Sequence, residues 1–180
     1  MDFYELVGKR QSCRAFDATR VVEPEKLQRI LEAARLAPSA CNAQPWHFVV
    51  VTEPALKDQV AQACSTKLLG LNHFTRQAPI HVLIVQESEN FTAGMGNLIK
   101  SKNFAQIDIG IATTHIVLAA EAEGLGTCIL GWFNESKIKT LLNIPRRKRV
   151  LLDILIGYST APIHEKKRKP TEQVVSMNKY

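Results

Sequence analysis

The chain lacks the features that mark secreted, membrane-spanning and disulfide-stabilised proteins. Its N-terminal sequence carries two acids and no apolar run, so we expect no signal peptide. In its most apolar stretch, Asp108, Glu121 and Glu123 leave only Ile109–Ala120 free of formal charge, too short to cross a bilayer, so we expect no membrane partner. The four cysteines are widely spaced and form no C-x-x-C pair, which predicts reduced thiols in a cytoplasmic protein (Cys13, Cys41, Cys64 and Cys128).

Sequence motifs for nucleotide binding, metal binding and nucleophilic catalysis are also missing. There is no Walker loop and no G-x-S-x-G elbow. Gly94-Met-Gly96 and Gly124-Leu-Gly126 are fragments of a dinucleotide fingerprint, and neither has the third glycine. The histidines lack metal-ligand spacing, so we predict no metal site. If the protein is an enzyme, we expect a bound cofactor to carry the chemistry.

The charge of the chain is moderately basic, at +6 from 23 Lys and Arg against 17 Asp and Glu. This excess suits an anionic ligand, and it equally suits solvated surface lysines. The basic runs Arg146–Arg149 and Lys166–Lys169 would be the candidate nucleic-acid contacts. Both are short and have no interleaved aromatic residues, so we expect no nucleic-acid partner.

A composition of 46% hydrophobic residues over 180 positions predicts one domain, residues 1–180, with a sizeable core. Apolar runs and helical patterns interleave, which indicates an α/β or α+β fold with one central sheet. The expected helices are a short one between Asp2 and Gly8, then Pro24 to about Ala37, Pro54–Leu69, Phe104–Gly124 with a start as early as Leu98, and a short one capped by Asn134. The expected strands are Trp46–Val51, Ile80–Val85, Thr127–Phe133 and Val150–Ile156, and Glu87–Asn97 is expected to be a mobile loop.

The chain is organised around Phe104–Gly124, which is apolar on almost every face. Such a helix is buried in a core or between subunits. Asp108 and His115 are seven residues apart on one helix face, where we expect a hydrogen-bonded core pair in preference to a proton relay. The tail from Thr160 carries Val174-Val175, and its length and apolar content indicate a segment that crosses to another subunit.

Two stretches are candidate ligand contacts. If Lys9–Arg14 is extended, Arg10, Ser12 and Arg14 point to one side, and their guanidiniums and hydroxyl would make a phosphate clamp. The alternative is a solvated basic strand. The polar loop Pro38–Pro45 is bracketed by prolines between a helix and a strand, which fits either a ligand edge or a plain connection.

Four blocks of this sequence, in this order, resemble the nitroreductase family of FMN enzymes. They are RQSCR at 10–14, APSACNAQPW at 37–46, GLGTCILG at 124–131, and KRKP at 167–170 followed by Val174-Val175. The resemblance covers nearly the whole chain. It implies an α+β fold with a mixed, mostly antiparallel central sheet flanked by helices. It also implies an intertwined homodimer with the long helix at the interface and the C-terminal tails exchanged between subunits.

The same resemblance implies two FMN sites at the dimer interface. The phosphate and the neighbouring polar edge would be held by Arg10, Ser12, Arg14 and Arg168, with Lys166 as a further member and Gln11 in the same block. Pro38, Ser39, Ala40 and Asn42 would line the flavin from the other chain, and Leu130 and Gly131 would lie beside the ring, with a backbone N–H near N5. No side chain of the protein is then the catalytic group, because the chemistry takes place at N5 of the flavin.

The implied activity is ping-pong hydride transfer from NADH or NADPH through FMN to a small oxidised acceptor, such as a nitro compound or a quinone. The alternative is a flavin-binding redox sensor or FMN carrier without turnover. The sequence departs from the family where Gln11 replaces a basic residue, and where a short Glu87–Asn103 segment predicts a more open pocket. Asn72 is a possible further flavin contact.

Overall fold

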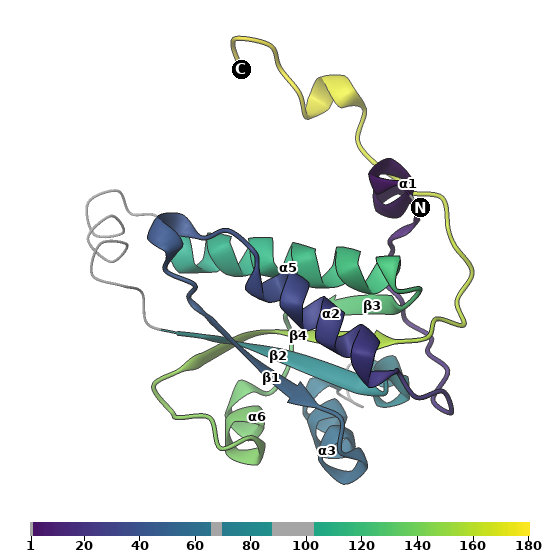
Figure 1. Ribbon diagram of the computed structural model, residues 1–180, viewed down its shortest axis with the longest axis vertical. Helices are drawn as coiled ribbons and strands as arrows, with labels where there is room; N and C mark the ends of the chain where they lie inside the picture. The colour runs from purple at the N-terminus through teal and green to yellow at the C-terminus, as the bar shows by residue number, and fades with distance from the viewer. Residues whose placement is uncertain (1, 66–69, 88–102) are drawn as a thin grey trace.

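The computed structural model describes residues 2–65, 70–87 and 103–180. Its centre is a four-stranded sheet in the order β1-β2-β4-β3 (Figure 1). All three neighbouring strand pairs are antiparallel, and in the described residues the parallel part of the predicted mixed sheet is an isolated bridge between Ser12 and Thr127. The strands are β1 (Trp46–Val51), β2 (Ile80–Gln86), β3 (Gly126–Leu130) and β4 (Arg149–Gly157). The fold is therefore α+β, with the mostly antiparallel sheet that was expected.

Helices cover both faces of this sheet. Figure 1 shows α2 (Pro24–Arg35) and α5 (Phe104–Ala122) on one face, and α3 (Pro54–Cys64) and α6 (Glu135–Leu141) on the other. The short α1 (Phe3–Lys9) lies near one end of α5. In the described part of the chain, no helix is long and apolar enough to span a membrane.

Short polar side chains define where several helices begin. The Asp2, Asn103 and Asn134 side chains each accept a backbone N–H three residues further on, at 2.8, 3.1 and 2.9 Å. Such caps satisfy N–H groups that have no partner inside the helix. Both α2 and α3 begin with proline, whose missing N–H costs nothing at a first helical position.

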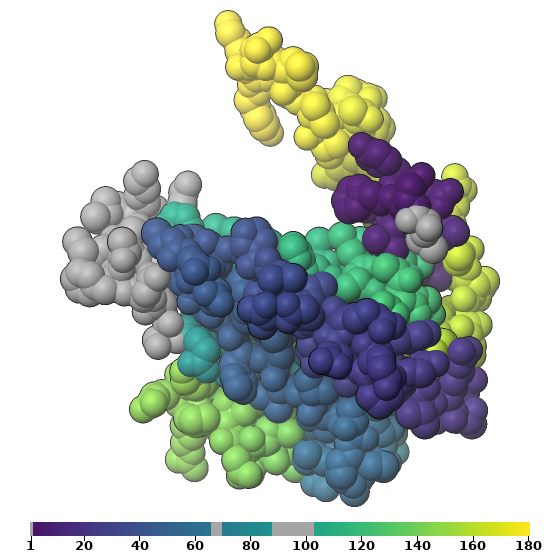
Figure 2. Space-filling view, viewed as in Figure 1, coloured from purple at the N-terminus to yellow at the C-terminus, as the bar shows by residue number. Residues whose placement is uncertain are grey.

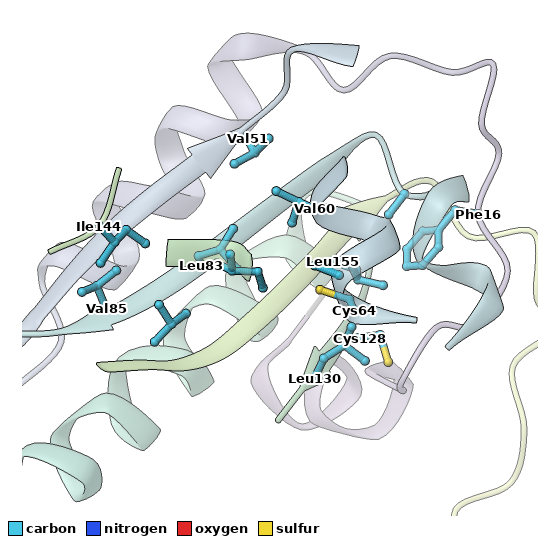
Figure 3. Packing of buried hydrophobic residues seen from close by; sticks show 14 of the residues in the cluster. Phe16, Val51, Val60, Cys64, Leu83, Val85, Cys128, Leu130, Ile144 and Leu155 are labelled. Carbon is cyan, nitrogen blue, oxygen red and sulfur yellow. The ribbon is translucent and has the colours of Figure 1, made fainter. Parts of the chain in front are cut away.

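Two apolar cores lie on the two faces of the sheet. Along β2, the side chains of Val82 and Ile84 face α2 and α5, while those of Leu83 and Val85 face α3 and α6. Figure 3 shows the second of these cores, where residues from β2 and β4 meet Val60 and Cys64 of α3. This alternation explains why β2 is a continuous apolar run, because a strand covered on both faces needs apolar residues at every position.

The predicted strands and most helix boundaries are confirmed, with four main differences. Helix α1 continues through Gly8, where it was predicted to end, to Lys9. The last strand-forming residue of β3 is Leu130 instead of Phe133, because pairing with β4 ends at Asp153. Helix α2 ends at Arg35, since Pro38 disfavours helical geometry at the residue before it. The described part of α3 ends at Cys64. The loop predicted for 87–97, apart from Glu87, the helix start at Leu98 and the Gly94–Gly96 fragment lie outside the described residues.

Candidate functional site

The N-terminal segment after α1 covers the outer edge of β3. The backbone N–H of Cys13 donates to the Thr127 carbonyl at 2.7 Å, and Ser12 forms the parallel bridge to Thr127. Cys13 is buried, while Ser12 and Arg14 are exposed. The predicted extended conformation is present after Arg10, with Ser12 and Arg14 on its outward side, whereas Lys9 is the last residue of α1 and Arg10 is its C-cap.

The C-terminal segment runs back along this N-terminal segment in the opposite direction. Phe16 forms an antiparallel bridge with Ser159, and the N–H of Thr160 donates to the Ala15 carbonyl at 3.0 Å. Further along, the Lys166 ammonium donates to the carbonyl of Gly8. Segments more than 140 positions apart in sequence thus lie side by side (Figure 1).

This arrangement brings basic residues of both termini together. Lys166 has a lowered pKa, caused by burial and then by the positive charges of Arg10 and Arg168. A group of like charges that lowers the pKa of a lysine attracts an anion, which would relieve the repulsion. The structure therefore assembles Arg10, Lys166 and Arg168 into one basic cluster, beside the edge that carries Ser12 and Arg14.

The ring-side candidates Leu130 and Gly131 lie at the far end of β3 from Thr127. Leu130 is buried and Gly131 is exposed. A Cβ added at Gly131 would have only the side chain of Leu152 nearby, at 4.0 Å, so the backbone is open to close approach by a flat group. Arg14 follows the Ser12–Thr127 bridge by two residues, and its charge acts on Cys128, the next residue but one before Leu130. Burial raises the pKa of Cys128, and the nearby charge of Arg14 opposes that rise.

The loop between α2 and β1 has an unusual backbone. Cys41, Asn42 and Gln44 have φ values of 51°, 53° and 47°, in the left-handed region that residues with a Cβ rarely adopt. The Ser39 hydroxyl accepts the N–H of Gln44 at 3.0 Å and holds the loop closed. Such conformations persist only where surrounding contacts impose them, and they concentrate at functional sites.

Asp108 supplies the contact that fixes this loop. Its carboxylate oxygens accept the N–H of Ala40 at 3.2 and 3.1 Å, and the side chain is buried. The prediction of an Asp108–His115 core pair is wrong, because His115 Nδ1 instead donates to the Ala33 carbonyl of α2 at 3.1 Å. A buried carboxylate needs donors, and here an exposed loop provides one. Asp108 thus holds the loop at Ala40, whereas the sequence analysis predicted His115 as its partner.

Two groups of candidate residues lie near opposite ends of α5 within one chain. Asp108 anchors the Pro38, Ser39, Ala40 and Asn42 loop near the start of the helix. Near its end, the charges of Arg10 and Lys166 act on Glu121, whose pKa burial raises. Glu121 follows Asp108 by thirteen residues, which corresponds to a rise of about 20 Å along the helix. A single chain therefore does not bring the loop to the basic cluster.

Asn72 has a structural role in this chain. It adopts a left-handed conformation with φ 57°, and its side-chain amide donates to the Cys64 carbonyl at 3.0 Å. It precedes the short 3₁₀ segment His73–Gln77. The amide group is thus occupied at the end of α3.

A buried polar cluster that sequence reasoning missed lies between α3 and the sheet. One oxygen of Asp153 is 2.8 Å from His81 Nδ1 and accepts the Cys64 thiol at 3.3 Å. Burial, and then the charge of Asp153, raise the pKa of the Cys64 thiol, so this cysteine stays protonated. These distances are those of hydrogen bonds. The available signal was a lone polar residue inside each apolar strand, His81 in β2 and Asp153 in β4, since a buried polar group requires a partner.

An open groove runs along the outer side of β1. It has a volume of about 810 Å³ and lies between α2 and β1, lined by apolar residues that include Leu27, Leu31, Trp46, Phe48 and Val50. β1 is at the end of the sheet and pairs with β2 on its inner side. The tail beyond Pro170 leaves the body of its own chain and is exposed throughout (Figure 2).

Comparison with known proteins agrees with these features. The Nitroreductase family model matches residues 7–158. An oxygen-insensitive NADPH nitroreductase of Helicobacter pylori strain J99 is 30% identical, over 92% of this chain and 91% of the relative. Iodotyrosine deiodinase 1 of the pig is 27% identical, over 97% of this chain and 68% of the relative. The solved structure of an FMN-dependent nitroreductase from Clostridium difficile R20291 is 28% identical, with a TM-score of 0.80, over 99% of this chain and 100% of the other.

Proposed function

Because this chain belongs to the nitroreductase family, we propose that it is an FMN-dependent NAD(P)H oxidoreductase formed as one domain over residues 1–180. The observation that carries the proposal is the basic cluster of Arg10, Lys166 and Arg168 beside Ser12 and Arg14. A phosphate monoester carries a charge of about −1.5 to −2 at neutral pH, and planar guanidiniums match its oxygens in paired hydrogen bonds. The names of two relatives, an NADPH nitroreductase and an FMN-dependent nitroreductase, support the same cofactor and donor.

The residues present also suit the rest of the cofactor. The exposed Gly131 backbone leaves room for a flat ring beside Leu130, and the strained loop residues Cys41 and Asn42 are exposed. Bound FMN would supply the redox chemistry, taking a hydride at N5 from NADH or NADPH and passing it to a small oxidised acceptor. The chain would bind the phosphate, orient the ring and leave one face open for the two substrates in turn.

We propose further that the active form is a homodimer, because neither end of α5 alone carries a complete site. Two antiparallel α5 helices around a two-fold axis would bring the Ser39–Asn42 loop of one chain to the basic cluster of the other. The outward face of α5 supports this arrangement, since Ile107 is 53% exposed there, on the side opposite the buried Ile109 and Ile116. A helix with an uncovered apolar face requires a partner surface.

We also propose that the C-terminal tails are exchanged in this dimer. Val174, Val175 and Met177 are 63%, 54% and 82% exposed in their own chain. The residues 174–180, if extended, would span about 23 Å, close to the roughly 20 Å length of β1. The tail of one chain therefore fits the open edge and apolar groove along β1 of the other, and would pair with that edge as an added strand.

The proposed setting is the reducing cytoplasm, which the buried free thiols of Cys13, Cys64 and Cys128 support. The proposed acceptor is a nitro compound or a quinone. The Helicobacter enzyme, named for nitro reduction, is matched over 91% of its length, whereas the deiodinase is matched over 68%. Iodotyrosine is therefore the comparison substrate to include in the assay.

The deciding experiment is an absorbance spectrum of the purified protein followed by anaerobic titration with NADH and with NADPH. We expect a yellow protein that bleaches with one of them and recovers its colour on adding a nitroaromatic compound or a quinone. Colour that persists with both donors would indicate a flavin-binding protein without turnover. A protein that stays colourless after incubation with excess FMN would contradict the whole proposal.

A further inference from the structure

Gln11 joins the two terminal segments through both ends of its side-chain amide. Its nitrogen Nε2 donates to the Pro162 carbonyl at 2.8 Å, and its oxygen Oε1 accepts the N–H of His164 at 3.0 Å. The two contacts span 151 and 153 positions of sequence. In the described residues, these bonds lie between the backbone pairing of Ala15 with Thr160 and the contact of Lys166 with Gly8.

We propose that Gln11 is a positioning residue for the phosphate site, and that it acts by holding the 162–168 segment against the N-terminal segment. This inference rests on the proposed FMN function. Gln11 is placed in the family's phosphate-binding block, yet both polar ends of its side chain already have protein partners. Its contribution to the cofactor is therefore indirect, through Arg10, Lys166 and Arg168.

The need for such a tie follows from the charges on the two segments. Arg10, Lys166 and Arg168 carry like charges that repel one another, and after burial the charges of Arg10 and Arg168 are the next causes of the lowered pKa of Lys166. Before an anion binds, this repulsion favours separation of the C-terminal segment from the N-terminal one. A neutral side chain that bonds both segments opposes the separation without consuming any of the positive charge.

Glutamine has the chemistry that this position requires. The amide provides a donor for the Pro162 carbonyl and an acceptor for the His164 N–H, whereas lysine and arginine only donate. A basic residue here would add charge to the cluster and would leave the His164 N–H without this acceptor. Compared with a basic residue, Gln11 therefore adds no positive charge to the cluster, but it fixes the positions of Arg10, Lys166 and Arg168.

The test compares the Gln11→Ala and Gln11→Glu variants with the wild type in the full-length protein. We expect Gln11→Ala to weaken FMN binding by about tenfold, and to change the affinity for riboflavin, which has no phosphate, by less than about twofold. Gln11→Glu keeps an acceptor for His164 but adds a negative charge near the phosphate, so we expect a larger loss. Gln59→Ala, at an exposed position on α3, is the matched control and should bind both flavins normally.

Hydrogen exchange of the His164 backbone amide measures its hydrogen bond to Gln11 directly and needs no cofactor. We expect this amide to be protected in the wild type and in Gln59→Ala, and to exchange faster in Gln11→Ala, with circular dichroism unchanged. Equal losses of FMN and riboflavin affinity, or an unchanged His164 exchange rate, would overturn the inference. If the wild type binds no FMN while His164 remains protected by Gln11, the proposed function fails and the tie stands as a structural contact alone.

Discussion

The two edges of the central sheet are completed in different ways. At the β3 edge, the chain covers its own backbone with the segment that carries Ser12 and Cys13. At the β1 edge, the described chain provides no strand, and an apolar groove lies alongside. The closed edge is also the one beside which the basic cluster gathers, whereas the open edge has the features of a docking surface.

This difference teaches how one small chain can build a site and a dimer interface with the same sheet. An unpaired edge strand invites pairing with another chain, so it must be covered in the functional form. The closed edge needs only its own termini to present positive charge. The open edge needs a second copy, and the same second copy would deliver the loop that Asp108 anchors. Assembly and cofactor binding are therefore expected to be coupled.

The largest effect is expected from placing charge on the tail that is proposed to cover the open edge. In the double variant Val174→Asp/Val175→Asp, a symmetric dimer would have to bury four carboxylates where four valine side chains packed. We expect the dimer dissociation constant to rise by at least about a thousandfold. Bound FMN should be lost with the dimer. Light scattering after gel filtration measures the mass, and absorbance measures the flavin content.

Val21→Asp is the control for that experiment, because Val21 is 80% exposed and lies outside the tail. It should remain a flavin-loaded dimer. If the tail variant also keeps its mass and its FMN, the two edges do not differ in the way described, and the β1 groove has another occupant.

The closed edge should be sensitive to volume where the termini meet β4. A Cβ at Gly157 would lie 2.5 Å from Cδ of Pro79 and 3.1 Å from Cδ1 of Phe16. Neither ring can move far, so Gly157→Ala should lower the free energy of unfolding by about 2–3 kcal/mol. The expected fall in Tm is roughly 5–10 °C by calorimetry. Gly8→Ala has no atom within 4 Å of the added Cβ and should show no fall; equal Tm values would mean that this edge is loosely packed.

The sequence predicts those features of the structure that depend on residues close together in the chain, and it does not predict those that depend on distant residues. The four strands follow from local apolar runs, and the caps at Asp2 and Asn134 follow from residues three positions apart. The outward placement of Ser12 and Arg14 follows from a period of two. These features depend on neighbours in sequence, so a single sequence is enough to predict them.

The features that were missed depend on partners far along the chain. The Asp108 carboxylate accepts a backbone N–H from 68 positions away. Every residue except proline has such an N–H group, so the sequence does not indicate which one Asp108 binds. The left-handed φ of Cys41 and Gln44 is imposed by the closed loop and not by residue type. Gln11 was placed beside the phosphate with its neighbours, since nothing in the sequence shows that Pro162 and His164 occupy its amide.

Removing one guanidinium from the closed edge should weaken the cofactor without affecting the fold. Arg14 is exposed on the edge of β3, and we expect Arg14→Ala to weaken FMN binding by about 10- to 100-fold, the loss of one or two charge-assisted hydrogen bonds. Fluorescence titration with FMN measures this, and Tm should change by less than about 2 °C. Arg147→Ala, at an exposed position before β4, should bind normally. Unchanged flavin content in Arg14→Ala would remove this residue from the site.

The smallest effect is expected from Glu121, an acid on which the charges of the basic cluster act. Burial raises the pKa of Glu121, and the charges of Arg10, Lys166 and Lys9 partly oppose this. Above its raised pKa the carboxylate is ionised and competes with the phosphate for these cations, so Glu121→Gln should tighten FMN binding there by about two- to fivefold. As the pH falls through the raised pKa of Glu121, the wild type becomes neutral there too, and the difference should vanish. Free FMN is the same ligand in both titrations, so the ratio of the two dissociation constants between pH 4.5 and 8 reports the effect of the charge at position 121. Glu25→Gln on α2 should give a ratio of one throughout. A ratio that does not change with pH would mean that Glu121 affects packing and not the charge of the cluster, and the closed edge would then owe its affinity for phosphate to the basic residues alone.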